Sequence, residues 1–263
     1  MPRANRYFLP GYVWHITHRC HKREFLLKFV RTRQRYQHWL YQARRRFAVE
    51  ILDYTITSNH VHLILRNQGG KNEIPAMLQL VASRTAQEYN ARKGRRGAFW
   101  EDRYHATAIE AGNHLQRCLT YVDLNMVRAG AVRHPEEWAH GGYHEIQGNR
   151  RRNTIIDLNA LAEILELSSR EALRSAHQEW IAEALSDEAQ EREDCWSQGI
   201  AVGSDAFVRQ TQLALGHRGR YRNRLEGEGV SVLREAEGGY GAVFGGENEP
   251  IGAENALLLD VSF

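Results

Sequence analysis

The chain of 263 residues predicts an α+β fold of the ferredoxin-like type, an antiparallel sheet with helices on one face. Residues 1–150 carry this prediction, because short β-branched or aromatic runs alternate with amphipathic segments. Residues 151–225 then show only short helical patterns, and residues 226–263 are Gly-rich and acidic. We therefore expect three parts with these boundaries: a sheet domain, a small helical extension and a flexible acidic tail.

The first four elements follow from local patterns. Residues 11–17, after a Pro-Gly pair, are β-branched and aromatic and predict the opening strand. An apolar stripe with a strongly basic outer face predicts a helix over residues 25–47. Residues 51–56 and 60–65 predict two strands, and the short polar connection between them suits a hairpin.

The later elements are predicted in the same way. Pro75 near a helix start predicts a second helix to about residue 90. Residues 105–109 predict the last strand, and residues 113–128 a third helix that Asn113 caps. Three helical patterns follow in the extension, at residues 155–167, 169–185 and 204–215.

Composition and charge limit the classes of partner. Residues 1–152 contain 26 Lys and Arg against 12 Asp and Glu, a net charge of +14, and the remainder has 9 against 20, a net charge of −11. A basic body favours nucleic acid as partner. The acidic tail, residues 226–263, is either a solvated segment or a nucleic-acid mimic that docks on the basic body and weakens DNA binding.

Other classes are disfavoured. Mean hydropathy is −0.58 and no apolar run is long enough to cross a bilayer, so we expect no membrane partner. The N-terminal residues show no secretion signal, which predicts a cytoplasmic protein, associated with the nucleoid through DNA. The three cysteines have no C-x-x-C spacing, which excludes a zinc ribbon or a dithiol redox centre.

Two histidines in an apolar strand are the sharpest local feature. Strand alternation places His60 and His62 on one face of the sheet and Val61 and Leu63 on the other. Two neutral imidazole nitrogens can then converge on one divalent ion. Taken alone, such a pair is more often explained by packing.

The helix over residues 113–128 carries a second candidate group. Its apolar stripe leaves Tyr121 about 120° from the stripe centre, with Asn125 and Arg117 one turn away on the same flank. An amide oxygen one turn from a tyrosine can bind a hard cation while the phenol points at whatever that cation polarises. Taken singly, Tyr121 also fits an ordinary residue at the core boundary.

Four segments together resemble a known family, the single-tyrosine HUH transposases, and in particular the REP-associated tyrosine transposases related to the insertion-sequence-200 type. The resemblance covers roughly residues 1–150, with a weaker similarity at residues 203–208. The segments are residues 1–3 with 10–19 (Pro-Gly-Tyr-Val-Trp-His-Ile-Thr-His-Arg), 59–64 (Asn-His-Val-His-Leu-Ile), 99–104 (Phe-Trp-Glu-Asp-Arg-Tyr) and 121–130.

The resemblance implies the HUH transposase fold and a set of roles. His60 and His62 are the motif histidines, Asn125 is the third ligand of Mg²⁺ or Mn²⁺, and Tyr121 is the nucleophile. Met126 stands where the family commonly has proline. The implied reaction nicks and rejoins single-stranded hairpin DNA of the repetitive extragenic palindrome type through a 5′-phosphotyrosine intermediate.

Basic and aromatic residues are the expected DNA contacts, through phosphates and base stacking. These candidates are Arg3, Arg19, Trp100, Arg103, Arg117 and Arg128. Each also fits a solvated or structural role. A protein that acts on two DNA ends could pair subunits, but no helix or strand identifies a homodimer interface.

Two other functions remain open at this stage. A domesticated protein could recognise hairpin DNA without cutting it, since binding and chemistry use overlapping surfaces. An RNA-binding ferredoxin-like module would instead depend on aromatic residues exposed on the sheet. Metal-dependent cleavage separates the first from an active transposase, and preference for DNA over RNA hairpins separates the second.

Overall fold

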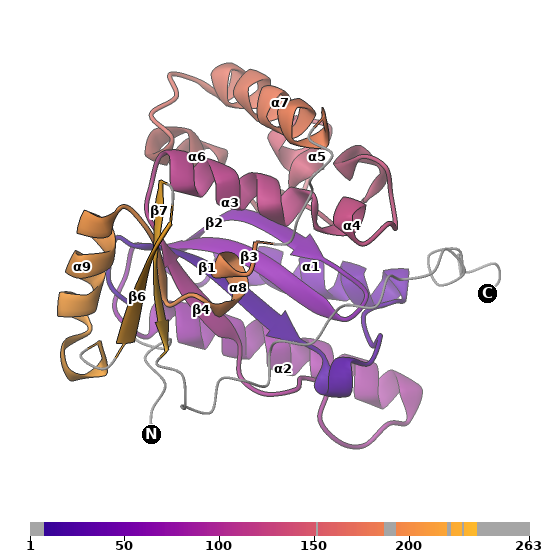
Figure 1. Ribbon diagram of the computed structural model, residues 1–263. Coiled ribbons are helices and arrows are strands. Elements are labelled where there is room, and N and C mark those ends of the chain that lie inside the picture. Colours follow the sequence, from indigo (N-terminus) through magenta and orange to yellow (C-terminus); the bar gives the residue numbers. More distant parts are fainter. Residues whose placement is uncertain (1–7, 151, 187–192, 220–221, 228, 236–263) are drawn as a thin grey trace.

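The computed structural model describes residues 8–150, 152–186, 193–219, 222–227 and 229–235. Within these residues the core is one sheet of seven strands in the order β2-β3-β1-β4-β5-β7-β6 (Figure 1). The strands are β1 (Val13–Arg19), β2 (Val49–Ile56), β3 (His60–Asn67), β4 (His105–Ile109), β5 (Ala201–Gly203), β6 (Arg222–Gly227) and β7 (Val230–Glu235).

The helices lie on both sides of this sheet (Figure 1). They are α1 (Val30–Arg44), α2 (Glu73–Lys93), α3 (Asn113–Asp123), α4 (Asn125–Arg128), α5 (Tyr143–Ile146), α6 (Leu158–Ile164), α7 (Arg170–Ser186), α8 (Cys195–Gln198) and α9 (Asp205–Ala214). None of the described helices combines the length and the apolar character that crossing a membrane requires.

The predicted ferredoxin-like order is confirmed. Strand β1 lies between β3 and β4 and is antiparallel to both, and β2 pairs with the outer edge of β3. Helices α1 and α2 pack together on one side of these four strands (Figure 1). The opposite side is covered by α3 and, beyond it, by helices of the extension.

Alternation along the strands gives the two sides different character. On the side of α1 and α2 the strands present apolar groups such as Ile16, Val61 and Leu63, all fully buried. On the side of α3, paired positions carry polar groups: Thr17 lies opposite His62 on β3 and opposite His105 on β4. The polar side of an otherwise apolar sheet therefore faces α3.

Helix α2 illustrates how local sequence sets the elements. Glu73 lies in its first turn, where a carboxylate is favoured, and Gly94 ends it in the left-handed region at φ 60°. Helix α1 is shorter than the predicted range 25–47, because Phe29 is extended and the helix begins only at Val30.

Helix α3 differs from the prediction at both ends. Gly112, at φ 73°, is the residue before the helix, and Asn113 is its first helical residue and makes no side-chain cap. The helix predicted to run to residue 128 is interrupted at Leu124, whose ψ is 2°, and α4 begins at Asn125.

The extension contributes strands that were not predicted. Strand β5 pairs in parallel with β4, so the predicted last strand, residues 105–109, is internal to the sheet. The boundary expected between residues 225 and 226 falls inside β6, and β7 follows it. The tail prediction is therefore wrong for residues 226–227 and 229–235, because pairing with β5 buries Val232 and Leu233 of β7. Residues 236–263 lie outside the described residues.

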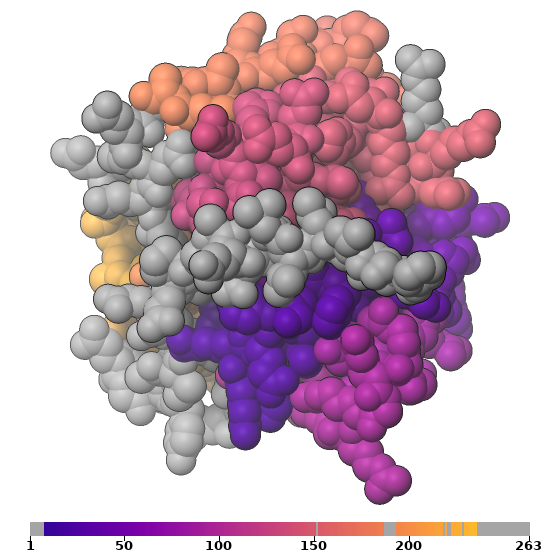
Figure 2. Space-filling model, turned by 90° about the vertical axis from the view of Figure 1, so that its right-hand side faces the viewer, coloured from indigo at the N-terminus to yellow at the C-terminus, as the bar shows by residue number. Residues whose placement is uncertain are grey.

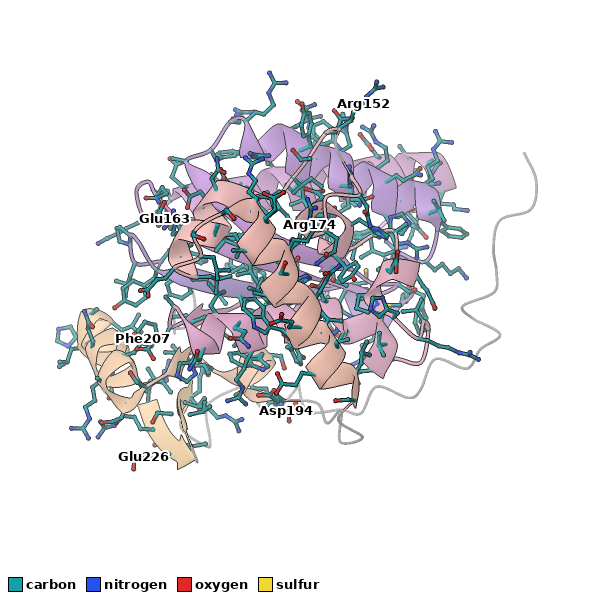
Figure 3. All side chains as sticks on the ribbon, turned by 90° about the horizontal axis from the view of Figure 1, so that it is seen from above. Arg152, Glu163, Arg174, Asp194, Phe207 and Glu226 are labelled. Atoms are coloured by element: carbon teal, nitrogen blue, oxygen red, sulfur yellow. The ribbon has the colours of Figure 1, made fainter. Side chains whose placement is uncertain are left out.

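The extension is packed on the sheet domain. Figure 2 shows α7, in orange, directly against the atoms of residues near 110–150, in pink. Seen from above in Figure 3, α9 and the β6–β7 hairpin, marked by Phe207 and Glu226, lie at one end of the molecule. The fully buried Trp196 and Leu161 belong to the same apolar core as the first four strands.

Candidate functional site

The two histidines predicted to share a face do so. His60 pairs with Arg19 of β1 and His62 with Thr17, so both imidazoles lie on the side of the sheet that α3 covers. Their ring centroids are 4.8 Å apart and the ring planes are 78° apart. Strand β3 is paired on both edges, which fixes the direction of these side chains.

The environment of His60 determines which ring nitrogen carries its proton. His60 Nδ1 lies 2.7 Å from Asn59 Oδ1, and Asn59 Nδ2 donates to the carbonyl of Arg23. Because the amide oxygen of Asn59 only accepts, His60 Nδ1 donates and Nε2 keeps its lone pair. This tautomer suits a metal ligand that binds through Nε2.

His62 contacts a third histidine that the sequence analysis did not select. His62 Nδ1 lies 2.8 Å from Nε2 of the fully buried His15, whose Nδ1 lies 2.7 Å from the carbonyl oxygen of Trp196. Burial lowers the pKa of His15 to about 4, so His15 is neutral near pH 7. The two imidazoles are nearly parallel, with centroids 5.0 Å apart. Only the register between β1 and β3, which has no local signal, brings His15 to His62.

Tyr121 lies over these histidines. Its ring is edge-on to His62 and His15, with centroid distances of 5.8 and 6.0 Å, and the residue is 5% exposed. The guanidinium of Arg128 lies 4.3 Å from the centre of the Tyr121 ring and also donates to the Tyr121 carbonyl oxygen. Arg128 therefore contacts both the ring and the main chain of Tyr121.

Asn125 completes the group. The break at Leu124 starts α4 at Asn125, and Asn125 Nδ2 lies 3.1 Å from His62 Nε2. The structure thus brings together His62, Tyr121 and Asn125, with His60 beside His62.

The donor set fits a divalent cation. Within the described part of the chain, no three His, Cys, Asp or Glu side chains cluster as metal ligands. Two imidazoles and one amide oxygen, however, form a mixed nitrogen and oxygen set once the Asn125 amide turns its oxygen toward His62.

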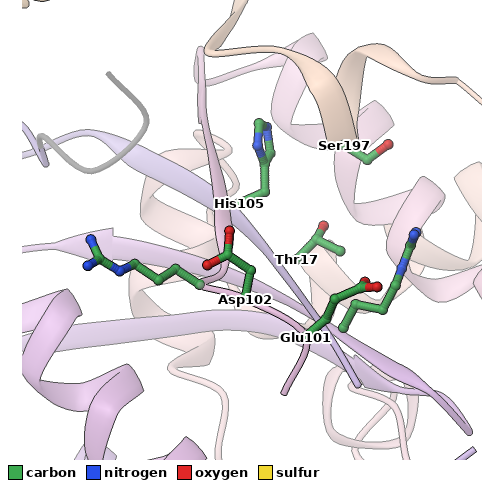
Figure 4. A pocket seen from close by; sticks show the side chains of 7 residues that line it. Thr17, Glu101, Asp102, His105 and Ser197 are labelled. Carbon is green, nitrogen blue, oxygen red and sulfur yellow. The ribbon is translucent and has the colours of Figure 1, made fainter. Parts of the chain in front are cut away.

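Two basic candidates for DNA contact line a pocket next to this site. Arg19 and Arg103 are among its lining residues. Thr17 and His105 of the sheet line it with Glu101, Asp102 and Ser197 (Figure 4). Arg19 is half-buried and Arg103 is exposed. Because Thr17 lies opposite His62, the pocket borders the histidine pair.

The other candidates have different surroundings. The Trp100 ring stacks on His18 at 4.2 Å, and its Nε1 donates to the carbonyl of Ala82, which holds it as an anchor of its loop. Arg117 Nη2 donates to Glu193 Oε2 at 2.8 Å. Arg128 lies at Tyr121, as described above, and Arg3 lies outside the described residues.

Buried polar groups lie next to α3. Asp123 Oδ2 accepts a hydrogen bond from His177 Nε2 at 2.7 Å, which connects α3 to α7. Burial, and then the charge of Asp123, raises the pKa of the fully buried Asp53 well above its usual value. An added Cβ at Gly142 would lie 2.0 Å from Asp53 Oδ1, so this carboxyl needs a glycine beside it.

Known proteins resemble parts of this chain. A solved structure of a REP-associated tyrosine transposase bound to a REP hairpin is 19% identical, with a TM-score of 0.48, and the match covers 60% of this chain and 94% of that chain. Curated proteins give no match. A family model described as "Transposase IS200 like" matches residues 10–125, a range that contains His60, His62, Tyr121 and Asn125. Residues 10–125, less than half of the chain, are thus similar to the IS200-like transposases.

Proposed function

We propose that this protein is a metal-dependent transposase that nicks and rejoins single-stranded hairpin DNA of the REP type through a 5′-phosphotyrosine intermediate. The observation that carries the proposal is the convergence of three groups: Tyr121 lies edge-on to His62, and Asn125 lies 3.1 Å from the same imidazole. A nucleophile, a nitrogen ligand and an amide ligand therefore share one site.

The roles follow from the contacts of each residue. His60, His62 and Asn125 would hold the divalent cation, Mg²⁺ or Mn²⁺, which when bound polarises a phosphate oxygen and offsets developing negative charge. The Tyr121 oxygen attacks phosphorus, so that a tyrosine–phosphorus bond forms and the bond to the 3′ oxygen breaks. The phenol proton passes to a base, and the 3′ oxygen leaves as a hydroxyl. Arg128, over the Tyr121 ring, stabilises the phenolate.

This step conserves the energy of the broken bond. The free 3′-hydroxyl can attack the phosphotyrosine and restore the strand, or a different strand can be joined, without an external energy source. The burial of Tyr121 limits the access of water to the intermediate.

The DNA partner is proposed from charge and from the position of the pocket. Arg19 and Arg103 line a pocket that borders His62 and that Glu101 and Asp102 also line, so we propose that the two guanidinium groups contact phosphates of the strand at the edge of this pocket. Each neutralised phosphate contributes about 0.7 to 0.9 to the slope of log affinity against log salt. Arg103→Ala should therefore weaken binding to hairpins of every sequence. It should also reduce the salt slope by about the amount that one phosphate contact contributes. Because the substrate is DNA, we place the activity in the cytoplasm, at the nucleoid.

The test is formation of a covalent adduct. Full-length protein is incubated with labelled single-stranded hairpin DNA and Mn²⁺, and a denaturing gel detects protein-linked DNA. Tyr121→Phe and His60→Ala should both lose the adduct, and chelation of the metal should do the same. Tyr143→Phe is the matched control, because Tyr143 is as buried as Tyr121, 6% against 5% exposed, and lies on α5.

The alternatives give different outcomes. Tight, salt-sensitive binding to a broad hairpin panel without any adduct identifies a DNA-binding protein that does not cleave. An RNA-binding module of this fold would need an open sheet face for base stacking. In the described residues, helices cover both faces of the first four strands (Figure 1). Preference for DNA over RNA hairpins in competition is the corresponding measurement.

A further inference from the structure

A main-chain carbonyl of the extension reaches the histidine pair. The Trp196 carbonyl oxygen, in α8, lies 2.7 Å from His15 Nδ1, across 181 positions of sequence. A carbonyl oxygen can only accept a hydrogen bond, so His15 Nδ1 carries a proton. Thr107 Oγ1 lies 3.1 Å from the same carbonyl oxygen.

The second nitrogen of His15 is thereby left as an acceptor. His15 is fully buried, and its two nitrogens face a carbonyl and an imidazole, neither of which carries negative charge. A buried imidazolium would lose its hydration there without compensation, so His15 is neutral and Nε2 keeps its lone pair. At 2.8 Å, His62 Nδ1 must then donate its proton to His15 Nε2.

This proton assignment also determines the state of the other ring nitrogen of His62, Nε2. With its proton on Nδ1, His62 presents a lone pair on Nε2, and this is the atom that lies 3.1 Å from Asn125 Nδ2. We infer that His15 is a positioning residue, which together with the Trp196 carbonyl fixes the His62 tautomer whose Nε2 binds the cation. The inference rests on the proposed role of His62 as a metal ligand. It also gives the C-terminal extension a part in the catalytic centre.

Hydrogen bonds to β4 hold the segment of the extension that follows α8. Gly199, directly after α8, has a carbonyl that accepts from Thr107 Oγ1 at 2.7 Å and lies 2.8 Å from His105 Nε2. Trp196 is itself fully buried. Trp196 and Gly199 lie outside the range 10–125 that matches the transposase family model, so the extension supplies a contact to the centre from beyond the matching range.

Nuclear magnetic resonance tests the tautomer directly. Full-length protein with ¹⁵N-labelled histidine is measured at mildly alkaline pH without added metal, and long-range proton–nitrogen correlations report which nitrogen of each ring is protonated. The His62 signals are identified by their loss in His62→Ala. We expect wild-type His62 to be protonated at Nδ1, and His15→Phe to shift it toward protonation at Nε2. Protonation of wild-type His62 at Nε2 would overturn the inference, even if His15→Phe does not fold.

Binding of Mn²⁺ provides a second readout that needs no DNA. Loss of free Mn²⁺ signal in electron paramagnetic resonance gives its affinity, which should fall by about 10- to 100-fold in His15→Phe. His18→Phe is the control, because His18 is a buried histidine of the same strand whose side chain faces the opposite side of the sheet and contacts Asp102. It should leave the His62 tautomer and the Mn²⁺ affinity unchanged. Equal Mn²⁺ affinity in wild type and His15→Phe contradicts the inference.

The two proposals fail in different ways. A wild-type protein with the expected His62 tautomer, lost in His15→Phe, that forms no tyrosine adduct contradicts the proposed function and supports the tautomer assignment. An active protein whose His62 is protonated at Nε2 contradicts only the role of His15.

Discussion

Glu145→Gln tests how the extension is attached to the sheet domain. The Glu145 side chain is completely buried, and one of its oxygens accepts from the backbone N–H groups of Ile155 and Ile156 at 2.6 and 2.8 Å. The other accepts from the Tyr54 hydroxyl at 2.9 Å and lies 3.4 Å from Arg150 Nη1. The substitution keeps the shape of the side chain and removes its charge.

The expected loss follows from these contacts. A hydrogen bond to a charged group contributes about 1.5 to 3 kcal/mol, and a neutral one about 0.5 to 1.5 kcal/mol. Each of the three short bonds of Glu145 therefore weakens by about 1 kcal/mol, for a total of about 3 kcal/mol. The new amide also places N–H groups toward the Tyr54 hydroxyl, so the hydroxyl proton loses its acceptor. The half-exposed Arg150 adds little because solvent screens it.

Urea unfolding followed by tryptophan fluorescence measures this change. The free energy of unfolding of Glu145→Gln should be about 3 kcal/mol below that of the wild type. Glu163→Gln is the control, because its carboxylate is 72% exposed and pairs with Arg66 at 3.2 Å, so it should change stability by less than about 1 kcal/mol. A loss below about 1 kcal/mol for Glu145→Gln as well would refute the reasoning.

Three further predictions concern other buried groups. Burial lowers the pKa of His18 to about 4 and that of His140 to about 3, so the urea midpoint should fall as pH drops from about 6.5 toward 4, where the unfolded chain binds protons that the folded chain does not. The pKa of Asp53 is raised in the folded protein, so the stability that its protonated form contributes is lost as pH rises. Asn at this position carries no charge, so the free energy of unfolding of Asp53→Asn should rise relative to that of the wild type as pH increases. Gly142→Ala should lower the free energy of unfolding by roughly 1 to 3 kcal/mol, because its Cβ would meet Asp53 Oδ1 at 2.0 Å. Gly141→Ala, whose nearest contact would be 3.4 Å, should be tolerated in the same assay, and equal losses at both positions would contradict the packing argument.

Local patterns predicted much of the sheet domain. Alternation along β3 placed His60 and His62 on one face, since the direction of successive side chains in a strand is a local property. The apolar stripe of α3 is likewise buried, with Leu115, Cys118 and Leu119 fully enclosed. The family resemblance, and not periodicity, supplied the roles of Tyr121 and Asn125, which the structure places beside His62.

Other features had too little local signal to be predicted. Strand β5 has only three residues, too few to show alternation. Strand β6 begins in the predicted helical extension and ends in the stretch from residue 226 whose Gly-rich composition indicated a tail, and β7 lies within that stretch. They form strands because each edge finds a partner, β5 along β4 and β7 along β5. The break at Leu124 likewise falls within a continuous helical pattern.

The sequence by itself determined the four-stranded core, the common face of the two histidines and the similarity of residues 10–125 to IS200-like transposases. Only the tertiary structure decided that His15 contacts His62 and that the Trp196 carbonyl contacts His15. The physical reason is that both contacts depend on strand register and on chain closure over long separations, 47 and 181 positions, which no local periodicity encodes.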